Sequence, residues 1–211
     1  MRAHATVLLI GVLFAAALGC YPEQITSLSQ LASVTTLVDS QAPLRNARTF
    51  ALPDTIVHLT PTTGPGVMRH DGDQQMIDRV RSELIALGWQ EITDVAAERP
   101  DVVVLMAVSE QTNTGVAYAG WWSYWGWWPG WPVGYGADWG WGYPANAVTF
   151  TYDTGTLLIT MLDVQHGDAS SRRVPLLWAA GVNGVLTSSS LQGALTGIDQ
   201  AFTQSPYLER K

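Results

Sequence analysis

Val102-Val103-Val104-Leu105-Met106-Ala107-Val108 is the stretch that decides the fold, because its seven residues are all apolar. A run of this length that opens with β-branched residues predicts a strand covered on both faces. Pro100-Asp101 comes directly before it and separates it from the preceding chain. We therefore expect residues 102–108 to lie at the centre of a β-sheet.

Two further strands are expected before this run. Residues 33–38 are Ser-Val-Thr-Thr-Leu-Val, a composition rich in β-branched residues. Residues 48–52, Arg-Thr-Phe-Ala-Leu, predict a second strand, which Pro53 ends. Residues 60–72 contain two Pro and several Gly and predict a loop.

More strands are expected after the run. Residues 148–152 alternate between apolar and polar, Gly155 interrupts the pattern, and residues 157–162 resume it. This pattern fits either one long strand with a bulge or two short strands. Residues 174–186 predict their partner strand, with bends at Gly181 and Gly184.

The first predicted helix covers residues 73–87. Ile77, Val80, Leu84 and Leu87 recur at spacings of three and four, which places them on one helix face. Gly88 is expected to end the helix in the left-handed conformation, and Trp89 should then pack back on the last turn. For the other end of the helix, we expect Asp71 to act as a side-chain cap and Gln74 as its capping-box partner.

A second amphipathic helix is predicted by Leu191, Leu195, Ile198 and Phe202, and it should stop before Pro206. Two helices with one apolar face each need a common apolar surface, which one face of a sheet supplies. The predicted fold class is α+β: a two-layer sandwich of a mixed β-sheet with two helices packed on one face. The helix between the strands at 48–52 and 102–108 implies that these two strands are parallel.

Charge narrows the function classes. The chain has 211 residues and a net charge of -7, and it contains no basic run. Nucleic-acid binding needs clustered Lys and Arg, so we expect no nucleic-acid partner. The negative net charge also argues against a domain surface that binds anionic lipid by electrostatic attraction.

The N-terminus has the pattern of an exported lipoprotein. Arg2 precedes an uncharged apolar run at residues 6–18, too short to cross a bilayer and of the right length for a signal peptide. Ala17-Leu18-Gly19-Cys20 resembles a lipobox, although the usual Leu lies one place late. We expect residues 1–19 to be the signal peptide and Cys20 to be lipidated; cleavage of an ordinary signal peptide nearby is the alternative.

Two further observations bear on Cys20. It is the only cysteine, so the chain can form no internal disulfide and no cysteine-based metal site. Acylation would explain a lone cysteine in an exported protein. Residue 21 is Tyr rather than Asp, which by resemblance to the enterobacterial sorting rule favours the periplasmic face of the outer membrane. Residues 20–32 would form the lipidated tether and residues 33–211 the α+β domain.

Several of these motifs together resemble a family. Residues 48–52, 83–89, 100–104 and 155–163 occur in the family's order, followed by Leu177-Trp178. The ordered set resembles the domain of unknown function 4136 family of bacterial envelope lipoproteins, over roughly residues 33–208. The resemblance implies an envelope lipoprotein and implies no known chemistry, so no catalytic residue is carried over. Two departures from the family pattern are a segment heavier in Trp and the apolar residues that follow Trp178.

A Trp/Gly-rich segment at residues 115–146 is the most unusual feature, since Asp138 is its only charged residue. It holds eight of the ten Trp residues of the chain: Trp121, Trp122, Trp125, Trp127, Trp128, Trp131, Trp139 and Trp141. Four roles fit such a segment. It could cover the free face of the sheet, dock another envelope protein, insert at the bilayer interface, or stack on sugar rings of an envelope glycan.

Candidate catalytic patterns are weak. Asp153-Thr154-Gly155 resembles the aspartic-protease triplet, but that chemistry needs two carboxylates, and a turn is the simpler interpretation. His70, Asp71 and Asp73 are better explained by helix capping than by a metal site. His58 and His166 are expected in loops, without an identifiable partner. Ser188–Ser190 lacks the glycines that flank a catalytic serine.

The sequence therefore predicts a non-enzymatic, outer-membrane-anchored lipoprotein without cofactor, metal site or catalytic residue. Its Trp-rich segment is the candidate docking surface, for an envelope protein or a glycan. The alternatives are an envelope enzyme and a glycan-binding module.

Overall fold

The computed structural model describes residues 34–39, 44–60, 64–66, 72–109, 113–114, 140–141, 151–152, 155–167, 170, 173–183 and 191–210. The helical elements are α2 (Asp73–Ala86), α3 (Leu191–Thr203) and the short 3-10 helices η2 (Leu44–Asn46) and η4 (Pro206–Leu208). The strands are β1 (Val34–Val38), β2 (Thr49–Ala51), β3 (Val57–Thr60), β4 (Gly64–Gly66), β5 (Gln90–Glu91), β6 (Val102–Ser109), β7 (Asn113–Thr114), β8 (Gly140–Trp141), β9 (Thr151–Tyr152), β10 (Thr156–Asp163), β11 (Arg173–Val174) and β12 (Leu176–Val182).

Strand β6 is the centre of the main sheet, as its unbroken apolar sequence predicts. Six strands run in the order β1-β12-β10-β6-β2-β5, and β3 and β4 complete an eight-stranded sheet. Strand β10 pairs antiparallel with β6 along its whole length, whereas β2 is parallel to β6. The sheet is therefore mixed, and the parallel arrangement expected for the two strands that α2 connects is confirmed.

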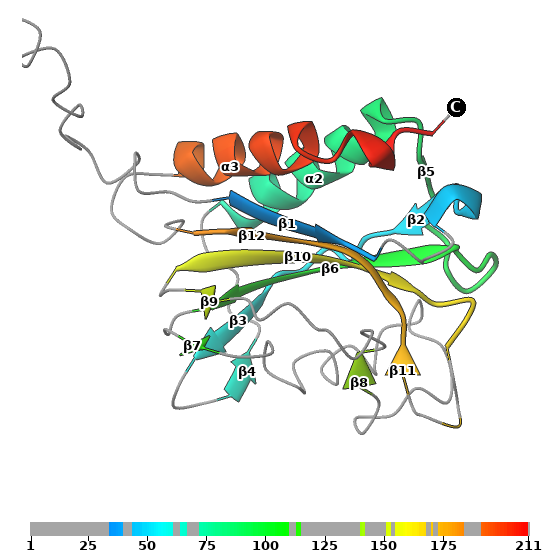
Figure 1. The fold of residues 1–211 in the computed structure, drawn as a ribbon, viewed down its shortest axis with the longest axis horizontal. Coiled ribbons are helices and arrows are strands. Elements are labelled where there is room, and N and C mark those ends of the chain that lie inside the picture. The colour runs from blue at the N-terminus through cyan, green and yellow to red at the C-terminus, as the bar shows by residue number, and fades with distance from the viewer. Residues whose placement is uncertain are drawn as a thin grey trace, which may run out of the picture.

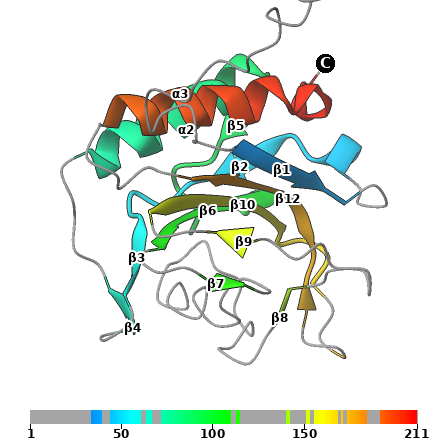
Figure 2. The same ribbon diagram turned by 60° about the vertical axis from the view of Figure 1, so that its left-hand side comes forward.

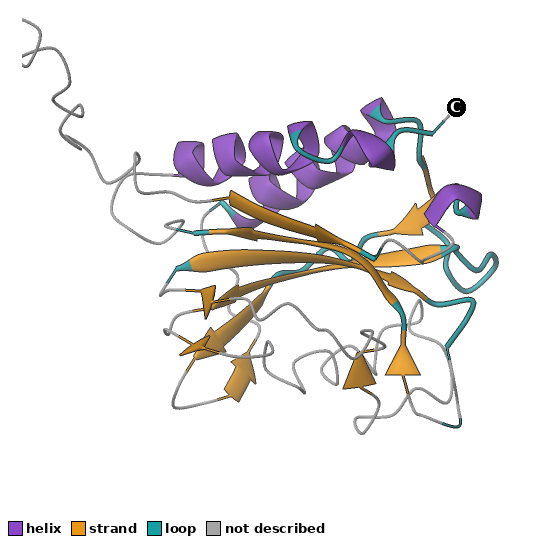
Figure 3. Cartoon of the chain, viewed as in Figure 1, coloured by secondary structure: helices purple, strands orange, loops and turns teal. Residues whose placement is uncertain are grey.

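Both helices lie on one face of this sheet (Figures 1 and 3). Apolar residues of α2 and α3 share one core cluster with alternate residues of β6, including Val104, Met106 and Val108. In the view of Figure 2, α3 crosses in front of α2 above the strands. The two-layer α+β sandwich predicted from the hydrophobic pattern is the observed architecture.

The prediction of a loop around His58 is wrong, because residues 57–60 form β3. Strand β2 covers only the start of β6, where Phe50 lies opposite Val102. The chain leaves the sheet after Ala51 and returns as β3, in which His58 lies opposite Val108 at the far end of β6. The short strands β2 and β3 thus both pair with the long strand β6. Local sequence does not encode this arrangement.

Other strand predictions are refined. Of the two alternatives for residues 148–162, two separate strands are present: β9 pairs with β7 in a small sheet, and β10 belongs to the main sheet. The expected strand at 174–186 is divided by Pro175 into β11 and β12, and β12 ends at Val182. The predicted bend at Gly184 lies outside the described residues.

Helix α2 ends as its sequence predicts. Gly88 has a φ of 88°, a conformation that glycine adopts without strain. Its N–H donates to the carbonyl of Ile85, and the N–H of Trp89 donates to that of Leu84. These two bonds form a Schellman motif and turn Trp89 back onto the helix, where it is buried.

The start of α2 differs from the prediction. Gly72 holds the N-cap position and, being glycine, has no side chain with which to cap the helix. The capping-box role expected for Gln74 is wrong, since its amide donates instead to Asp78 Oδ1 at 3.1 Å. Asp71, the expected cap, lies outside the described residues.

Helix α3 packs closely on β12. A Cβ atom built on Gly197 would lie only 2.2 Å from Val182 Cγ1, so the helix approaches the strand at a residue without a side chain. Nearby, the ring centroids of Trp178 and Phe202 lie 5.3 Å apart. Trp178 is almost fully buried, and its indole N–H donates to Ser205 Oγ. This part of the core joins the sheet to the chain that follows α3.

Asp101 joins the beginnings of β2 and β6. Its Oδ2 accepts hydrogen bonds from the backbone N–H groups of Arg48 and Thr49, at 2.8 and 2.9 Å. Its own backbone N–H donates to Thr49 Oγ1. Burial alone would raise the pKa of Asp101, but these hydrogen bonds and the charge of Arg48 outweigh burial and lower that pKa.

Candidate functional site

Trp141 is the only one of the eight candidate Trp residues that the structure describes. It lies in β8, whose backbone pairs in parallel with β11, with Trp141 opposite Val174. Trp121, Trp122, Trp125, Trp127, Trp128, Trp131 and Trp139 lie outside the described residues, as does Cys20. The structure therefore locates β7, which comes directly before the Trp/Gly segment, and β8, which lies inside the segment near its end.

Both of these strands lie on the side of the main sheet that faces away from the helices (Figures 1 and 2). Strand β7 is held there by β9, in which Tyr152 lies opposite Asn113. Strand β8 is held by β11, the segment directly before β12. Residues 115–139 thus connect two points on the same side of the sheet.

The sheet face on this side is buried although no described helix covers it. Side chains of a strand point alternately to opposite faces, so Val103, Leu105 and Ala107 point away from the helices. All three have an exposed fraction of 0%, and Leu158 and Leu162 of β10 are also buried. A sheet open to solvent on one side carries polar residues there. This face is instead apolar and covered, and we name these five residues the second face.

A polar row closes one end of the second face. Ser109, Thr156 and Asn183 lie at one level of three adjacent strands, and Thr156 Oγ1 donates to Asn183 Oδ1. Gly155, with a φ of 84°, donates its N–H to the carbonyl of Ser109 at 2.7 Å. Gly155 of the protease-like triplet therefore belongs to a turn between strands, and Asp153 and Thr154 lie outside the described residues.

His58 and Asp73 form a buried pair that the sequence did not reveal. His58 Nε2 lies 3.1 Å from Asp73 Oδ2, and their side chains are 3% and 7% exposed. The expectation that His58 lies in a loop without a partner is wrong. Asp73 lies in the first turn of α2, and its contact with His58 joins that turn to β3. They lie fifteen positions apart in the chain, and only the return of β3 to the sheet brings them together.

Ser109 lies near this pair in the sheet but on the other face. Ser109 follows Val108, and Val108 shares the helix side of the sheet with His58. Successive residues of a strand point to opposite faces, so the Ser109 hydroxyl lies across the sheet from the imidazole. The sheet therefore separates the Ser109 hydroxyl from the His58–Asp73 pair.

The second expected lone histidine also has a partner. His166 Nδ1 lies 2.8 Å from Asp163 Oδ2, in the turn after β10. Asp163 Oδ1 also accepts the backbone N–H groups of Gln165 and His166, so this carboxylate organises the turn. Among the described residues, no group of three metal-ligating side chains comes together.

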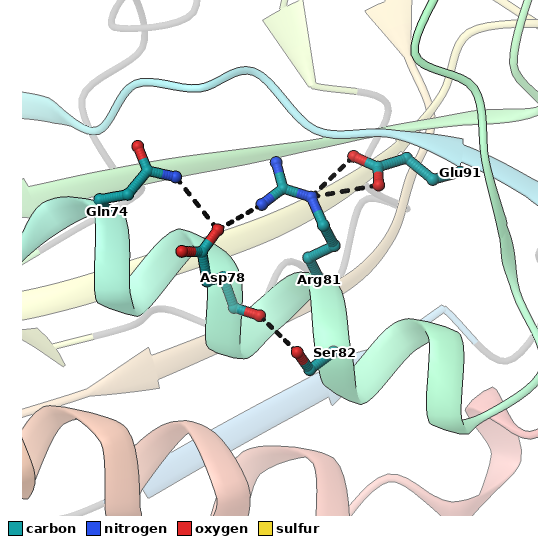
Figure 4. A network of polar contacts seen from close by, with 5 residues as sticks. All are labelled: Gln74, Asp78, Arg81, Ser82 and Glu91. Atoms are coloured by element: carbon teal, nitrogen blue, oxygen red, sulfur yellow. Dashed lines mark hydrogen bonds and ion pairs between the residues drawn. The ribbon is translucent and has the colours of Figure 1, made fainter.

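The outward face of α2 carries a polar network (Figure 4). Arg81 Nε contacts both carboxylate oxygens of Glu91 in β5, at 2.9 and 3.1 Å, and its Nη1 contacts Asp78 at 2.6 Å. Burial opposes the charge of Arg81, but Glu91 and the other nearby carboxylates outweigh it and raise its pKa. Gln74 and Ser82 bond to Asp78. The network ties the helix to the edge strand.

The C-terminal segment is held by Trp89, one of the two Trp residues outside the Trp/Gly segment. Its indole N–H donates to the carbonyl of Leu208 at 2.8 Å. The guanidinium carbon of Arg210 lies 4.0 Å from the centre of a Trp89 ring. Burial, and secondarily the charge of Arg48, lower the pKa of Arg210 to about 10. Trp89 thus serves the core, as does Trp178.

A mixed sheet with two helices on one face and a covered apolar second face defines an α+β sandwich domain. The chain belongs to the family of the domain of unknown function DUF4136, whose model matches residues 34–207. This match confirms the family predicted from the ordered motifs.

The chain is similar to several solved structures. The crystal structure of a DUF4136 family protein from Bacteroides thetaiotaomicron VPI-5482 is 27% identical, with a TM-score of 0.66 and coverage of 85% of this chain and 98% of that chain. A PelC dodecamer from Paraburkholderia phytofirmans is 14% identical, with a TM-score of 0.37, 82% of this chain and 97% of that one. A PDZ domain protein from Parabacteroides distasonis ATCC 8503 is 12% identical, with a TM-score of 0.40, 83% of this chain and 36% of that one. No curated protein matches this chain.

Proposed function

We propose that this chain is an outer-membrane-anchored lipoprotein with a non-enzymatic binding or structural role in the cell envelope. Lipid on Cys20 is the anchor, and the Trp-rich segment is a docking surface for an envelope protein. The observation that carries the proposal is that β7, just before the Trp/Gly segment, and β8, inside it, both lie on the side of the main sheet that faces away from the helices. The positions of β7 and β8 support a role for the Trp/Gly segment on that side of the sheet.

The position of β1 fits a short tether. Val34 begins the first described strand, fourteen positions after Cys20, and β1 is an edge of the main sheet. A fully extended chain of that length reaches at most about 50 Å. A domain held this close to a membrane can use a weak aromatic contact, because tethering raises the local concentration of both partners. None of the described helices is long and apolar enough to span a bilayer.

The polar contacts of the described core support a non-enzymatic role. The His58–Asp73 pair joins a strand to a helix, the Asp101 carboxylate joins two strands, and the Asp163 carboxylate organises a turn. Each of these groups stabilises the fold through named partners. An enzyme would instead need acid, base or nucleophile groups that converge on one substrate position.

The anchor is tested with the Cys20→Ser variant of the full chain. We expect the parent protein to sediment with membranes and to incorporate radiolabelled palmitate, and the variant to lose both properties. A Tyr21→Phe variant is the control, since it changes the neighbouring residue without removing the thiol, and it should behave as the parent does. Membrane retention of Cys20→Ser without label would refute the lipid anchor.

The docking role is tested by replacing Trp121, Trp122 and Trp125 with Ser in the full chain, and with Phe as the matched control. We expect in-cell cross-linking to an envelope protein to fall at least tenfold in the Ser variant and to persist in the Phe variant, with an unchanged melting temperature in both. A large fall in melting temperature would favour a covering role for these rings. Retention of the parent chain on purified peptidoglycan, lost in the Ser variant and on adding sugar fragments, would favour the glycan-binding alternative.

A further inference from the structure

The outer edge of β1 carries backbone groups with no strand beside them in the described part of the chain. Strand β1 is the terminal strand of the main sheet and pairs with β12 on one side. In Figure 2 it runs along the margin of the sheet, below α3. Thr35 and Val38 are solvent-exposed, so this margin is accessible.

Register shows which groups point outward. The N–H of Asp39 donates to the carbonyl of Leu177. In an antiparallel pair, opposite residues alternate between hydrogen-bonded and non-hydrogen-bonded positions. Leu37, two residues before Asp39, therefore uses its N–H and C=O on β12. Thr36, at the centre of β1, directs both groups to the outer edge.

In the described part of the chain, β1 lacks three of the devices that usually prevent pairing at an edge. Natural edge strands carry charged residues, Pro or bulges. The sequence of β1, Val-Thr-Thr-Leu-Val, has neither charge nor Pro, and its register with β12 is unbroken. Helix α3 packs on β1, and its single charged residue, Asp199, is paired with Arg79 of α2. The residues of β1 and α3 therefore bring no unpaired charge to this edge, and the carboxylate of Asp39 lies just beyond the end of β1.

Exposed apolar side chains gather at one end of the same edge. Val38 and Tyr207 are two of the three large hydrophobic residues that are exposed in the described chain, at 38% and 39%. Val38 lies opposite Trp178, whose indole donates to Ser205 Oγ. Ser205 Oγ in turn lies 3.1 Å from the Tyr207 hydroxyl. This series of contacts connects Tyr207 to Trp178, the residue opposite Val38.

We propose that two copies of this chain pair through β1, antiparallel, so that their main sheets become continuous. A two-fold axis through Thr36 sets Thr36 opposite Thr36 of the partner subunit and Val34 opposite Val38 of the partner subunit. These are matched cross-strand pairs of the kind that stabilise sheets. Val34 shares a level with buried Val182 on the helix side, so the helices of both copies lie on the same side. The interface is self-complementary, as two-fold symmetry requires.

Disulfide trapping of the full chain in membranes tests both the contact and its register. Hydrogen-bonded opposite residues have Cα atoms about 5.5 Å apart, within the roughly 4.4–6.8 Å that a disulfide spans. We expect Thr36→Cys to give a disulfide dimer at least tenfold more abundant than Thr35→Cys or Leu37→Cys. In the proposed dimer, Thr35 lies opposite Leu37 of the partner subunit, so a cysteine at position 35 or 37 does not face its own counterpart. The parent chain, with Cys20 alone, measures any background.

A second variant removes the outward donor. Thr36→Pro deletes an N–H that β12 does not use, and Pro is tolerated at strand edges for that reason. We expect light scattering of the detergent-solubilised full chain to show a dimer for the parent and for Thr36→Val, and loss of the dimer for Thr36→Pro. If circular dichroism shows that Thr36→Pro does not fold, the cysteine series decides alone. A monomeric parent, or equal disulfide yields at positions 35, 36 and 37, would overturn the proposal.

Discussion

Asp73 Oδ2 lies 3.1 Å from His58 Nε2, and this contact joins the first turn of α2 to β3 in the interior of the protein. The two residues belong to different layers of the sandwich. A helix N-terminus favours a carboxylate, and here the carboxylate also fixes the position of the helix relative to the sheet. The pair therefore serves as a connection between layers.

Asp73→Ala should destabilise the protein, because it leaves the buried imidazole without this carboxylate. Loss of one partner of a buried polar pair costs about 1–3 kcal/mol. Chemical denaturation followed by tryptophan fluorescence measures the free energy of unfolding. Gln75→Ala, on the exposed side of the same helix, is the control and should stay within about 0.5 kcal/mol of the parent. An Asp73→Ala variant as stable as the control would contradict a structural role for the pair.

Gly197→Ala and Gly193→Ala should have opposite effects although both lie in α3. An added methyl at Gly197 meets Val182 Cγ1 at 2.2 Å, whereas nothing lies within 4 Å at Gly193. Overpacking costs about 1–3 kcal/mol, and an exposed helical Gly→Ala substitution gains up to about 1 kcal/mol. Thermal unfolding of both variants checks the sign. Gly197→Ala combined with Val182→Ala should relieve the clash between the added methyl and Val182 Cγ1; a double variant that loses the full sum of both penalties would argue against this contact.

Asp101→Asn should reduce stability at neutral pH and flatten its acid dependence. The pKa of Asp101 is lowered in the folded protein, so its contribution is complete above the unfolded value, about 3.9. The contribution is lost as the pH falls from there through the lower folded pKa, because protonation then favours the unfolded chain. Urea unfolding of parent and variant between pH 7 and pH 3 should show curves that converge at the acid end. Parallel curves throughout this range would be inconsistent with the assignment.

The Arg81–Glu91 contact should contribute little despite its bidentate geometry. Their side chains are 26% and 16% exposed, and partly exposed ion pairs contribute about 0.2–1 kcal/mol. A double-mutant cycle with Arg81→Met and Glu91→Gln isolates the coupling energy. We expect a value below about 1 kcal/mol that decreases at 1 M salt. A coupling above about 2 kcal/mol would mean that the edge strand β5 depends on this network.

Most of the fold was predictable from hydrophobic pattern. Residues 102–108 predict the central strand, the spacing from Ile77 to Leu87 predicts α2, and Gly88 marks the end of that helix, because each pattern depends on neighbours in sequence. The position of β3 was not predictable, since four residues gain strand structure only by joining the free part of β6. The partner of His58 was missed for the same reason, and no local signal would have revealed it.

The amino-acid sequence by itself determined most of the secondary structure, the α+β class and the family, because periodicity and motif order are properties of the chain. It also supplies the lipobox-like residues at Cys20 and the concentration of Trp residues on which the proposed function depends. Only the tertiary structure decided that β3 pairs with the far end of β6, that Asp73 meets His58, and that β1 presents Thr36 at an edge of the main sheet. Those relationships join residues far apart in the chain, and they exist only once the sheet has assembled.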